Sequence, residues 1–581
     1  MTNEVSTVPA ARTSDLDGGR ITHPAGRPIT VAAAEQLYLA ARWLGDVLSH
    51  AFGADWQRTP AEPDISFLLD GHLPPSGYRL AISPSADDAP TTPNGRIEVR
   101  AADLAGAFAA AQTLRQLTGP QAFRHAPLAG AELTWPTGVI EDAPQAAWRG
   151  VHFDVARHFA PSREVRRFIG LAAAHHLNVV QLHLTDDQGW RFESLRHPEL
   201  TRRGAWRTAS ARGHHDTDID PLPHGGFYTQ DDLREIVAYA HGCGVTVVPE
   251  IDLPGHVEAA LAAYPWLGTT KQPSPVRTVW GISDDVLDPG PDQVAFFCDV
   301  LDEVCDVFDS PFVHIGGDEV PTTLWQRSPA ITARAASLGF FGPDGQPDVS
   351  RLHGWFLRQL VDHLHGRGRR AVVWDEALGP DLPKDAIVMS WRGLRPGAQA
   401  IKAGHDVVLA PEQFLYLDHR ASDRADEPSP VGYVRTVEDV YAFDAALLAQ
   451  VPGGCEFTVV PGGLADLPLP GDRPGAVLGM QAQVWTEYME NTRRVDYAAY
   501  PRLAAFAEVA WGTAPALRQP DSPASQAFMT RLEDAHLPRL AAAGVEFRPL
   551  DGPLPWQTKP GLTTGDTRNL DDDMRAAGGL L

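Results

Sequence analysis

The sequence predicts an α/β protein in which a (β/α)8 TIM barrel follows a small α+β domain. Over residues 146–515, short apolar runs alternate with amphipathic helical segments, which is typical of βα units in a parallel sheet. The runs number eight, and eight repeats match a closed barrel with enlarged loops better than an open, doubly wound sheet. Before them, residues 27–145 carry segments of strand-like alternation followed by a helical segment, which predicts the α+β domain.

The eight apolar runs are the predicted barrel strands, and they cover residues 150–156, 178–186, 245–252, 312–319, 370–377, 386–392, 406–411 and 476–485. Two of the helices between them have clear signals. Val165, Phe168 and Ile169 fall on one helical face, after the candidate N-cap Ser162. Thr229 begins a T-x-x-D pattern, which predicts a capping box at the start of the next helix.

Three further regions lie outside the predicted barrel. Residues 77–83 and 96–101 alternate like an antiparallel pair of strands within the domain of residues 27–145. Residues 1–26 are polar and small and have no periodicity, so we expect a flexible tail. Residues 516–581 predict a C-terminal helix followed by a polar tail.

Composition limits the possible partners. The net charge of −25 argues against nucleic acid and anionic membranes, because phosphate contacts need a basic surface. No apolar run reaches the roughly 18 residues of a membrane span, and residues 1–20 lack the pattern of a secretion signal, so we expect a cytoplasmic protein. The four cysteines show no metal-binding spacing. We therefore expect no metal and no other cofactor.

Polar and aromatic residues gather where the predicted strands end, which is where barrel enzymes carry their active sites. These residues are Asp154, Arg157, Asp186, Asp187, Glu250, Asp252, His256, Asp318, Glu319, Trp374, Asp375, Glu376, Trp391, Tyr416, Asp418, Trp485 and Glu487. Tryptophans beside carboxylates are typical of sugar sites, because sugar rings stack on indoles and hydroxyls bond to carboxylates. The sequence therefore predicts a carbohydrate substrate.

The adjacent pair Asp318 and Glu319 favours one mechanism. A retaining glycosidase with two protein carboxylates places acid and nucleophile on opposite sides of the bond, typically on different strands. An adjacent pair suits the substrate-assisted alternative. Glu319 would then protonate the leaving oxygen, and Asp318 would hold a 2-acetamido group whose carbonyl oxygen attacks C1.

The barrel region resembles the β-N-acetylhexosaminidases of glycoside hydrolase family 20. The resemblance rests on WRGVHFDVARHF (148–159), LNVVQLHLTDDQGWR (177–191), VPEIDLPGH (248–256), HIGGDEV (314–320), VVWDE (372–376), SWRG (390–393), YLD (416–418) and QVWTEY (483–488). The preceding α+β domain resembles the non-catalytic domain of that family. The resemblance implies an exo-acting, retaining enzyme. It would remove terminal non-reducing β-linked N-acetylglucosamine or N-acetylgalactosamine, for example from chitooligosaccharides, through an oxazolinium-like intermediate.

The resemblance also implies a role for each site residue. Glu319 is the general acid and then the base, with a pKa that tryptophan walls would raise by desolvation. Asp318 binds the acetamido N–H, and His256 with Asp186 orients the catalytic pair. The remaining implied contacts to the sugar come from Tyr416 on the acetamido oxygen, from Trp374, Trp391 and Trp485 as walls, and from Arg157, Asp418 and Glu487 on the outer hydroxyls.

One family feature is missing. The family usually has a further Trp after the Y-x-D motif as a platform for the leaving sugar, and residues 421–434 contain none. Tyr433 is the nearest aromatic residue there. Without a secretion signal, we expect intracellular recycling of amino-sugar fragments, or their release from small glycoconjugates, by a monomer or homodimer.

Several alternatives stay open from the sequence. A metal-dependent barrel hydrolase is one, because His, Asp and Glu are plentiful at the strand ends; a sugar-binding relative without catalysis is another. Asp375 and Glu376 fit helix capping as well as a site role. Within the strands, we interpret His152, His183 and His314 as packed barrel residues and not as ligands.

Overall fold

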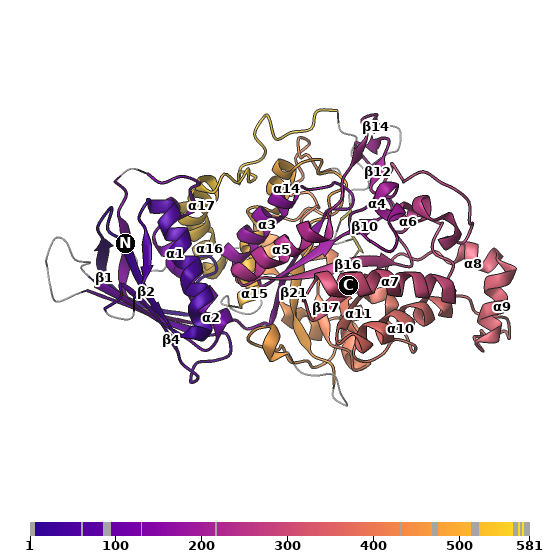
Figure 1. Ribbon diagram of the computed structural model, residues 1–581, viewed down its shortest axis with the longest axis horizontal. Helices are drawn as coiled ribbons and strands as arrows, with labels where there is room; N and C mark the ends of the chain where they lie inside the picture. The colour runs from indigo at the N-terminus through magenta and orange to yellow at the C-terminus, as the bar shows by residue number, and fades with distance from the viewer. Residues whose placement is uncertain are drawn as a thin grey trace.

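A computed structural model describes residues 6–59, 62–84, 95–128, 130–214, 218–429, 431–467, 474–512, 522–561, 568–569 and 572–573. Figure 1 shows an N-terminal domain at one end of the molecule and a larger barrel domain beside it. Among the described residues, no helix is long and apolar enough to cross a membrane.

The larger domain is a closed barrel of eight parallel strands, in the order β16-β17-β18-β19-β20-β21-β8-β9. Its strands are β8 (Trp148–Asp154), β9 (Val179–His183), β16 (Thr246–Leu253), β17 (Phe312–Gly316), β18 (Arg370–Trp374), β19 (Ile387–Ser390), β20 (Val407–Leu409) and β21 (Val477–Ala482). Each strand lies within or overlaps one of the eight predicted runs, so the predicted barrel is confirmed. Most strands end before their run does, because the polar residues at the end of the run turn out of the hydrogen-bond ladder.

Helices cover the outside of the barrel. The main ones are α3 (Ser162–Ala174), α5 (Gln230–Gly242), α7 (Pro291–Val307), α10 (Arg351–Gly366), α11 (Leu394–Lys402) and α15 (Arg502–Trp511). The capping box predicted at Thr229 is present, with Asp232 as its partner. The N-cap predicted at Ser162 is wrong, because α3 begins at Ser162 and its cap position is Pro161, which makes no side-chain cap.

The connections that follow the barrel strands carry shorter elements. These are β10 (Thr185–Asp186), β11 (Gly189–Trp190), α4 (Glu199–Arg202), β12 (Trp206–Arg207), β13 (Ser210–Ala211), β14 (Ile219–Asp220), β15 (His224–Gly225), α6 (Glu258–Ala263), η3 (Pro265–Leu267), α8 (Thr323–Arg327), α9 (Pro329–Ser337), η4 (Asp375–Ala377), α12 (Glu412–Leu415), α13 (Val437–Ala442), η5 (Ala445–Ala449), η6 (Leu464–Asp466) and α14 (Thr492–Ala499). Between β18 and β19 the only described helical turn is η4, so this βα unit has no full helix there.

The N-terminal domain is a seven-stranded sheet in the order β1-β7-β5-β6-β4-β2-β3. Its elements are β1 (Thr13–His23), β2 (Ile29–Ala33), η1 (Glu35–Leu37), α1 (Tyr38–Phe52), β3 (Trp56–Arg58), β4 (Ile65–Leu69), β5 (Tyr78–Pro84), β6 (Gly95–Ala101), α2 (Leu104–Leu117), η2 (Pro120–Phe123) and β7 (Leu133–Asp142). The two predicted strands are β5 and β6, which pair antiparallel.

The flexible tail predicted for residues 1–26 is wrong over most of its length. Thr13–His23 forms β1, which pairs antiparallel with β7, and Val8 is fully buried, with its N–H bonded to Gln116 Oε1 at 2.8 Å. The pairing uses backbone groups, so the strand forms although most of its side chains are exposed. Residues 1–5 lie outside the described part of the chain.

The C-terminal helical region packs back on the N-terminal domain. It consists of α16 (Pro523–Arg531), η7 (Leu532–His536) and α17 (Leu537–Ala542), drawn in yellow beside α1 in Figure 1. Buried Arg539 donates to the carbonyl oxygens of Ser6 at 2.8 Å and Gln116 at 3.0 Å. Residues far apart in sequence thus hold the two domains together.

Candidate active site

The predicted site residues all lie at or just beyond the carboxyl ends of barrel strands. The catalytic pair follows β17, where Gly316 has φ +69° and Gly317 φ +105°, and Glu319 itself has φ +46°. This turn brings Asp318 and Glu319 to the same site, whereas successive residues of a regular strand would point to opposite faces. Gly316 is required here, because a Cβ on it would lie 1.7 Å from Asp252 Oδ1.

His256 connects the catalytic pair to the neighbouring strand ends. Its Nε2 lies 3.3 Å from Glu319 and 3.6 Å from Asp318, and its Nδ1 lies 3.4 Å from Asp186. Burial alone would lower the pKa of His256, but the surrounding carboxylates, Asp186 above all, raise it well above its ordinary value. The surrounding carboxylates therefore favour the charged imidazolium form of the buried His256.

The two members of the catalytic pair have different acidities. Burial, with Glu319 close by, raises the pKa of Asp318 to about 6. For Glu319, burial also acts to raise the pKa, but the hydrogen bond and charge of His256 outweigh it and lower the pKa. The expectation of a raised pKa at Glu319 is therefore wrong, because it counted the apolar walls and not the charge of His256.

Arg157 forms a second cationic centre, next to Asp186. Its Nη2 lies 2.7 Å from Asp186 Oδ2, and its Nη1 lies 4.0 Å from Glu487. The guanidinium carbon lies 4.8 Å from the centre of the Trp485 ring. Asp186 thus lies between the cations Arg157 and His256, which hold its pKa well below the ordinary value although burial opposes them.

The three predicted tryptophans and Tyr416 form one aromatic wall. The Trp485 ring centre lies 6.1 Å from that of Trp374 and 6.2 Å from that of Tyr416, and Trp391 is stacked 6.1 Å from Tyr416. The indole N–H of Trp485 is buried and has no partner among the described residues. A polar group of a ligand against this wall would satisfy it.

Asp418 and Glu487 place two carboxylates close enough to repel each other. Burial, and then Glu487, raises the pKa of Asp418 well above its ordinary value. Burial also raises the pKa of Glu487, although Arg157 opposes this. Asp418 Oδ1 is buried and has no partner among the described residues. Asp418 Oδ1 therefore has a hydrogen-bonding position that a ligand hydroxyl would satisfy.

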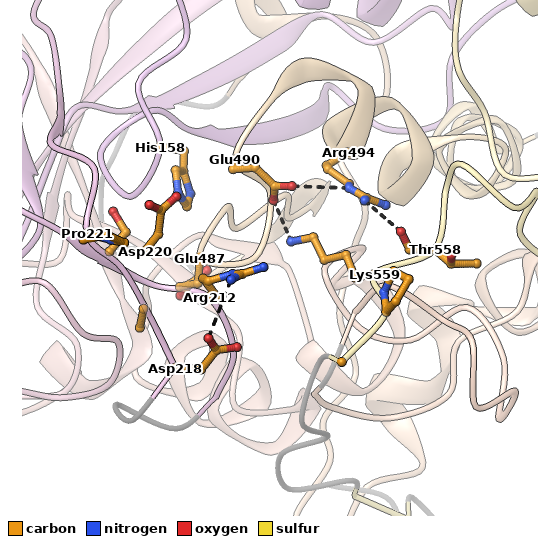
Figure 2. A pocket seen from close by; sticks show the side chains of 14 residues that line it. His158, Arg212, Asp218, Asp220, Pro221, Glu487, Glu490, Arg494, Thr558 and Lys559 are labelled. Atoms are coloured by element: carbon orange, nitrogen blue, oxygen red, sulfur yellow. Dashed lines mark hydrogen bonds and ion pairs between the residues drawn. The ribbon is translucent and has the colours of Figure 1, made fainter.

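A cavity of about 700 Å³ adjoins the site on the Glu487 side (Figure 2). Its walls are polar and charged, and many of the charges are paired. Lys559 bonds to Glu490 at 2.6 Å, and Arg212 lies 3.9 Å from Asp218. Glu487 lines the cavity and also faces Arg157, so the site continues into a polar hollow.

Sequence reasoning missed the role of Glu250, a fully buried carboxylate inside the barrel. It lies 2.7 Å from His183 Nδ1 and 3.0 Å from His314 Nδ1, and it accepts a 3.0 Å hydrogen bond from Trp374 Nε1. Both histidines are buried as predicted, but they are paired with a charge. The strand alternation places His183 and His314 on the barrel interior. This pattern could have predicted that a buried carboxylate pairs with them.

Asp375 and Glu376 also differ from their capping interpretation. Neither caps η4. Asp375 accepts hydrogen bonds from the backbone of Trp391 at 2.9 Å and of Arg392 at 3.1 Å, and Glu376 accepts one from Trp391 Nε1 at 2.9 Å. Both carboxylates hold Trp391 in the aromatic wall.

Four groups of three His, Asp and Glu residues lie close enough to share a metal ion within the described part of the chain. Two contain His256, whose Nδ1 lies 3.4 Å from Asp186 and whose Nε2 lies 3.3 Å from Glu319, so both ring nitrogens already face carboxylates within the protein. The other two contain His183, which is held between Asp186 and Glu250. The donors fit a proton network better than a metal site.

Comparisons with known proteins agree with this geometry. The model of "Glycosyl hydrolase family 20, catalytic domain" matches residues 147–514, and that of "Glycosyl hydrolase family 20, domain 2" matches residues 4–143. A β-hexosaminidase of Vibrio furnissii is 36% identical over 81% of this chain and 70% of its own length. One of Porphyromonas gingivalis is 37% identical over 70% of this chain, and the alignment spans only 48% of that protein.

Solved structures give the same result. The family 20 exo-β-N-acetylglucosaminidase of Vibrio harveyi, solved in complex with N-acetylglucosamine, has a TM-score of 0.76 at 29% identity, over 95% of this chain and 79% of that one. The β-N-acetylhexosaminidase of Streptomyces coelicolor has a TM-score of 0.73 at 26% identity, over 96% and 98%. The family models together cover most of the sequence, and the chain therefore belongs to glycosyl hydrolase family 20.

Proposed function

We propose that this chain is an exo-acting, retaining β-N-acetylhexosaminidase that works by substrate-assisted catalysis. The observation that carries the proposal is the placement of Asp318 and Glu319 on one turn, both within 3.6 Å of His256 Nε2. Two adjacent carboxylates can act on two different groups of one substrate. They are poorly placed to act as acid and nucleophile from opposite sides of one glycosidic bond. The names of the relatives support the same activity.

In the first step, the 2-acetamido oxygen of the bound sugar attacks C1 and the glycosidic bond breaks. Asp318 accepts the acetamido N–H and stabilises the positive charge of the oxazolinium-like intermediate. Tyr416 donates to the acetamido oxygen, and Trp374, Trp391 and Trp485 enclose the methyl group and the ring. No covalent bond to the protein forms.

Glu319 gives its proton to the leaving oxygen in this step and takes a proton from water in the next. The proton on His256 Nε2 lies within reach of Glu319, at 3.3 Å, so the pair can move a proton onto the carboxylate. The Glu319 side chain is 31% exposed. A bound sugar would cover it and increase its burial, which favours the protonated form.

The outer hydroxyls of the sugar are assigned to Arg157, Asp418 and Glu487. Arg157 donates to the hydroxyls at C3 and C4, and the two carboxylates accept from those at C4 and C6. These contacts support binding of a terminal, non-reducing residue. All site residues come from one chain, which is compatible with a monomer or a homodimer.

Turnover of p-nitrophenyl N-acetyl-β-glucosaminide tests this proposal. The enzyme should release p-nitrophenol, and the galacto epimer and chitooligosaccharides complete the substrate panel. No turnover of any of them would refute the activity and favour a sugar-binding protein without catalysis. Activity lost on exhaustive chelation, and restored by a metal ion, would instead favour a metal-dependent hydrolase.

A further inference from the structure

Arg568, near the C-terminus, contacts the segment in which the platform tryptophan is missing. The catalytic family model ends at residue 514, yet the backbone N–H of Arg568 donates to the carbonyl oxygen of Gly432 at 3.3 Å. Gly432 belongs to residues 421–434, which follow the Y-x-D motif and contain no Trp. A residue outside the matched catalytic domain thus reaches this part of the barrel mouth.

The side chain of Arg568 covers Tyr433. Its guanidinium carbon lies 4.5 Å from the centre of the Tyr433 ring, and the Tyr433 hydroxyl donates to Asp573 at 2.7 Å. Tyr433 is fully buried, whereas the Arg568 side chain is 42% exposed. Tyr433 is therefore not available to stack on a leaving sugar, and the surface at this place is the guanidinium.

Glu412 ties Arg568 to the aromatic wall. The Glu412 carboxylate accepts a 2.8 Å hydrogen bond from Arg568 Nη1, and its backbone N–H donates to the carbonyl oxygen of Trp391 at 2.8 Å. Burial raises the pKa of Glu412, and Glu319 is close enough to add to that effect. Glu412 is also close enough to contribute to the raised pKa of Tyr416, after burial. Arg568 and Glu412 therefore lie next to the backbone of Trp391, a residue of the aromatic wall.

The donors of Arg568 are only partly used. Nη1 bonds to Glu412 and Nε bonds to Asp573 at 3.1 Å, while no acceptor for Nη2 is found in the part of the chain that the structure describes. A guanidinium offers five N–H donors in a fixed plane. Nη2 of this partly exposed guanidinium is thus suited to sugar hydroxyls or to an amide carbonyl.

We propose that Arg568, held by Glu412 and Tyr433, binds the leaving sugar in place of the missing tryptophan. This inference rests on the proposed function. Nη2 would donate to the hydroxyls or the acetamido carbonyl of that sugar. A charged donor forms stronger hydrogen bonds with a polar leaving group than with an aromatic one. The site should therefore bind neutral saccharide leaving groups more tightly than aryl leaving groups.

The test compares two leaving groups in Arg568→Ala. Loss of the guanidinium should lower kcat/KM for N,N′-diacetylchitobiose about tenfold, which corresponds to about 1.4 kcal/mol. The loss for p-nitrophenyl N-acetyl-β-glucosaminide should be at least about fivefold smaller, because p-nitrophenol has no hydroxyls for Nη2 to bind. Arg568→Lys keeps the charge without the plane and should fall between wild type and Arg568→Ala.

Arg234→Ala is the matched control. Arg234 lies on α5, is 47% exposed and is paired with a carboxylate, Asp231, at 2.9 Å; its loss should leave both substrates unchanged. Equal effects of Arg568→Ala on the two substrates, or no effect on either, would overturn the inference. Failure of the wild-type enzyme to cleave the aryl substrate would instead refute the proposed function, so the two failures are distinguishable.

Discussion

Single side chains set the acid–base chemistry of this site. A proton on His256 Nε2 faces both carboxylates of the catalytic pair. It lowers the pKa of Glu319, while burial brings the pKa of Asp318 to about 6. The proposed mechanism needs a charged Asp318 and a protonated Glu319. Under that proposal, sugar binding shifts the proton from His256 Nε2 towards Glu319.

Replacement of the acid tests its role directly. Glu319→Gln should lower kcat for chitobiose by about 10²–10⁴-fold, the usual contribution of a general acid. It should leave KM within a few-fold, because the aromatic wall is intact. The aryl substrate needs less protonation and should lose less. Near-normal turnover of chitobiose by Glu319→Gln would refute the assignment.

Glu376 gives a prediction for stability. Burial, Asp375 and Asp318 raise its pKa to about 9 from 4.5, so the folded protein prefers the neutral acid. The contribution of Glu376 to the free energy of unfolding is therefore complete below the pKa that this side chain has in the unfolded chain. It is lost as the pH rises towards 9, by up to about 1.4 kcal/mol per pH unit. Glu376→Gln stays neutral and keeps an acceptor for Trp391.

Urea unfolding at pH 6 and pH 8 measures this effect. Wild type should lose about 2–3 kcal/mol more than Glu376→Gln between these two pH values. Glu35→Gln, at an 82% exposed position of the N-terminal domain, is the control and should follow wild type. Parallel losses in wild type and Glu376→Gln would contradict the raised pKa.

Residue identities at the strand ends could be predicted, but their acidities could not. Asp318, Glu319 and His256 stand at the ends of apolar runs, and barrel geometry brings such positions together. The pKa of Glu319 depends on an imidazolium from another strand end. Glu250 likewise has its partners on other strands, at distances that the sequence does not encode.

At the level of elements, the end of β17 positions the catalytic pair. Gly316→Ala should abolish most activity and cost about 3 kcal/mol or more, because its Cβ would lie 1.7 Å from Asp252 Oδ1 in a backbone with φ +69°. Gly354→Ala in α10 is the control, with its nearest atom at 3.4 Å, and helix propensity favours it. Activity measurement and urea unfolding check both variants. A fully active, stable Gly316→Ala enzyme would contradict this role.

Elements were predictable where side-chain patterns decide them. The eight barrel strands are apolar runs, because both faces of a parallel sheet are buried. β1 was not predicted, because its polar side chains are mostly exposed and backbone pairing with β7 holds it. The capping box at Thr229 was predicted correctly, but the N-cap at Ser162 was not. Capping depends on the backbone conformation of the residue before the helix, which side-chain patterns do not decide.

At the scale of the whole molecule, residues near the C-terminus contact residues that lie far from them in the sequence. Arg539 binds Ser6 and Gln116 across the domain boundary, and Arg568 reaches Gly432 at the barrel mouth. These contacts join residues more than 100 positions apart in sequence. Local periodicity carries no information about them, so the sequence predicted the domains and not their connections.

The central claim is that the substrate supplies its own nucleophile within a site built by the whole barrel. The most direct measurement is the ratio of kcat/KM for p-nitrophenyl N-acetyl-β-glucosaminide to that for p-nitrophenyl β-glucoside. The two substrates differ only at C2, so the ratio isolates the acetamido group. We predict a preference of about 10³-fold or more, because an intramolecular nucleophile is lost with that group. Comparable rates on the two substrates would contradict the mechanism.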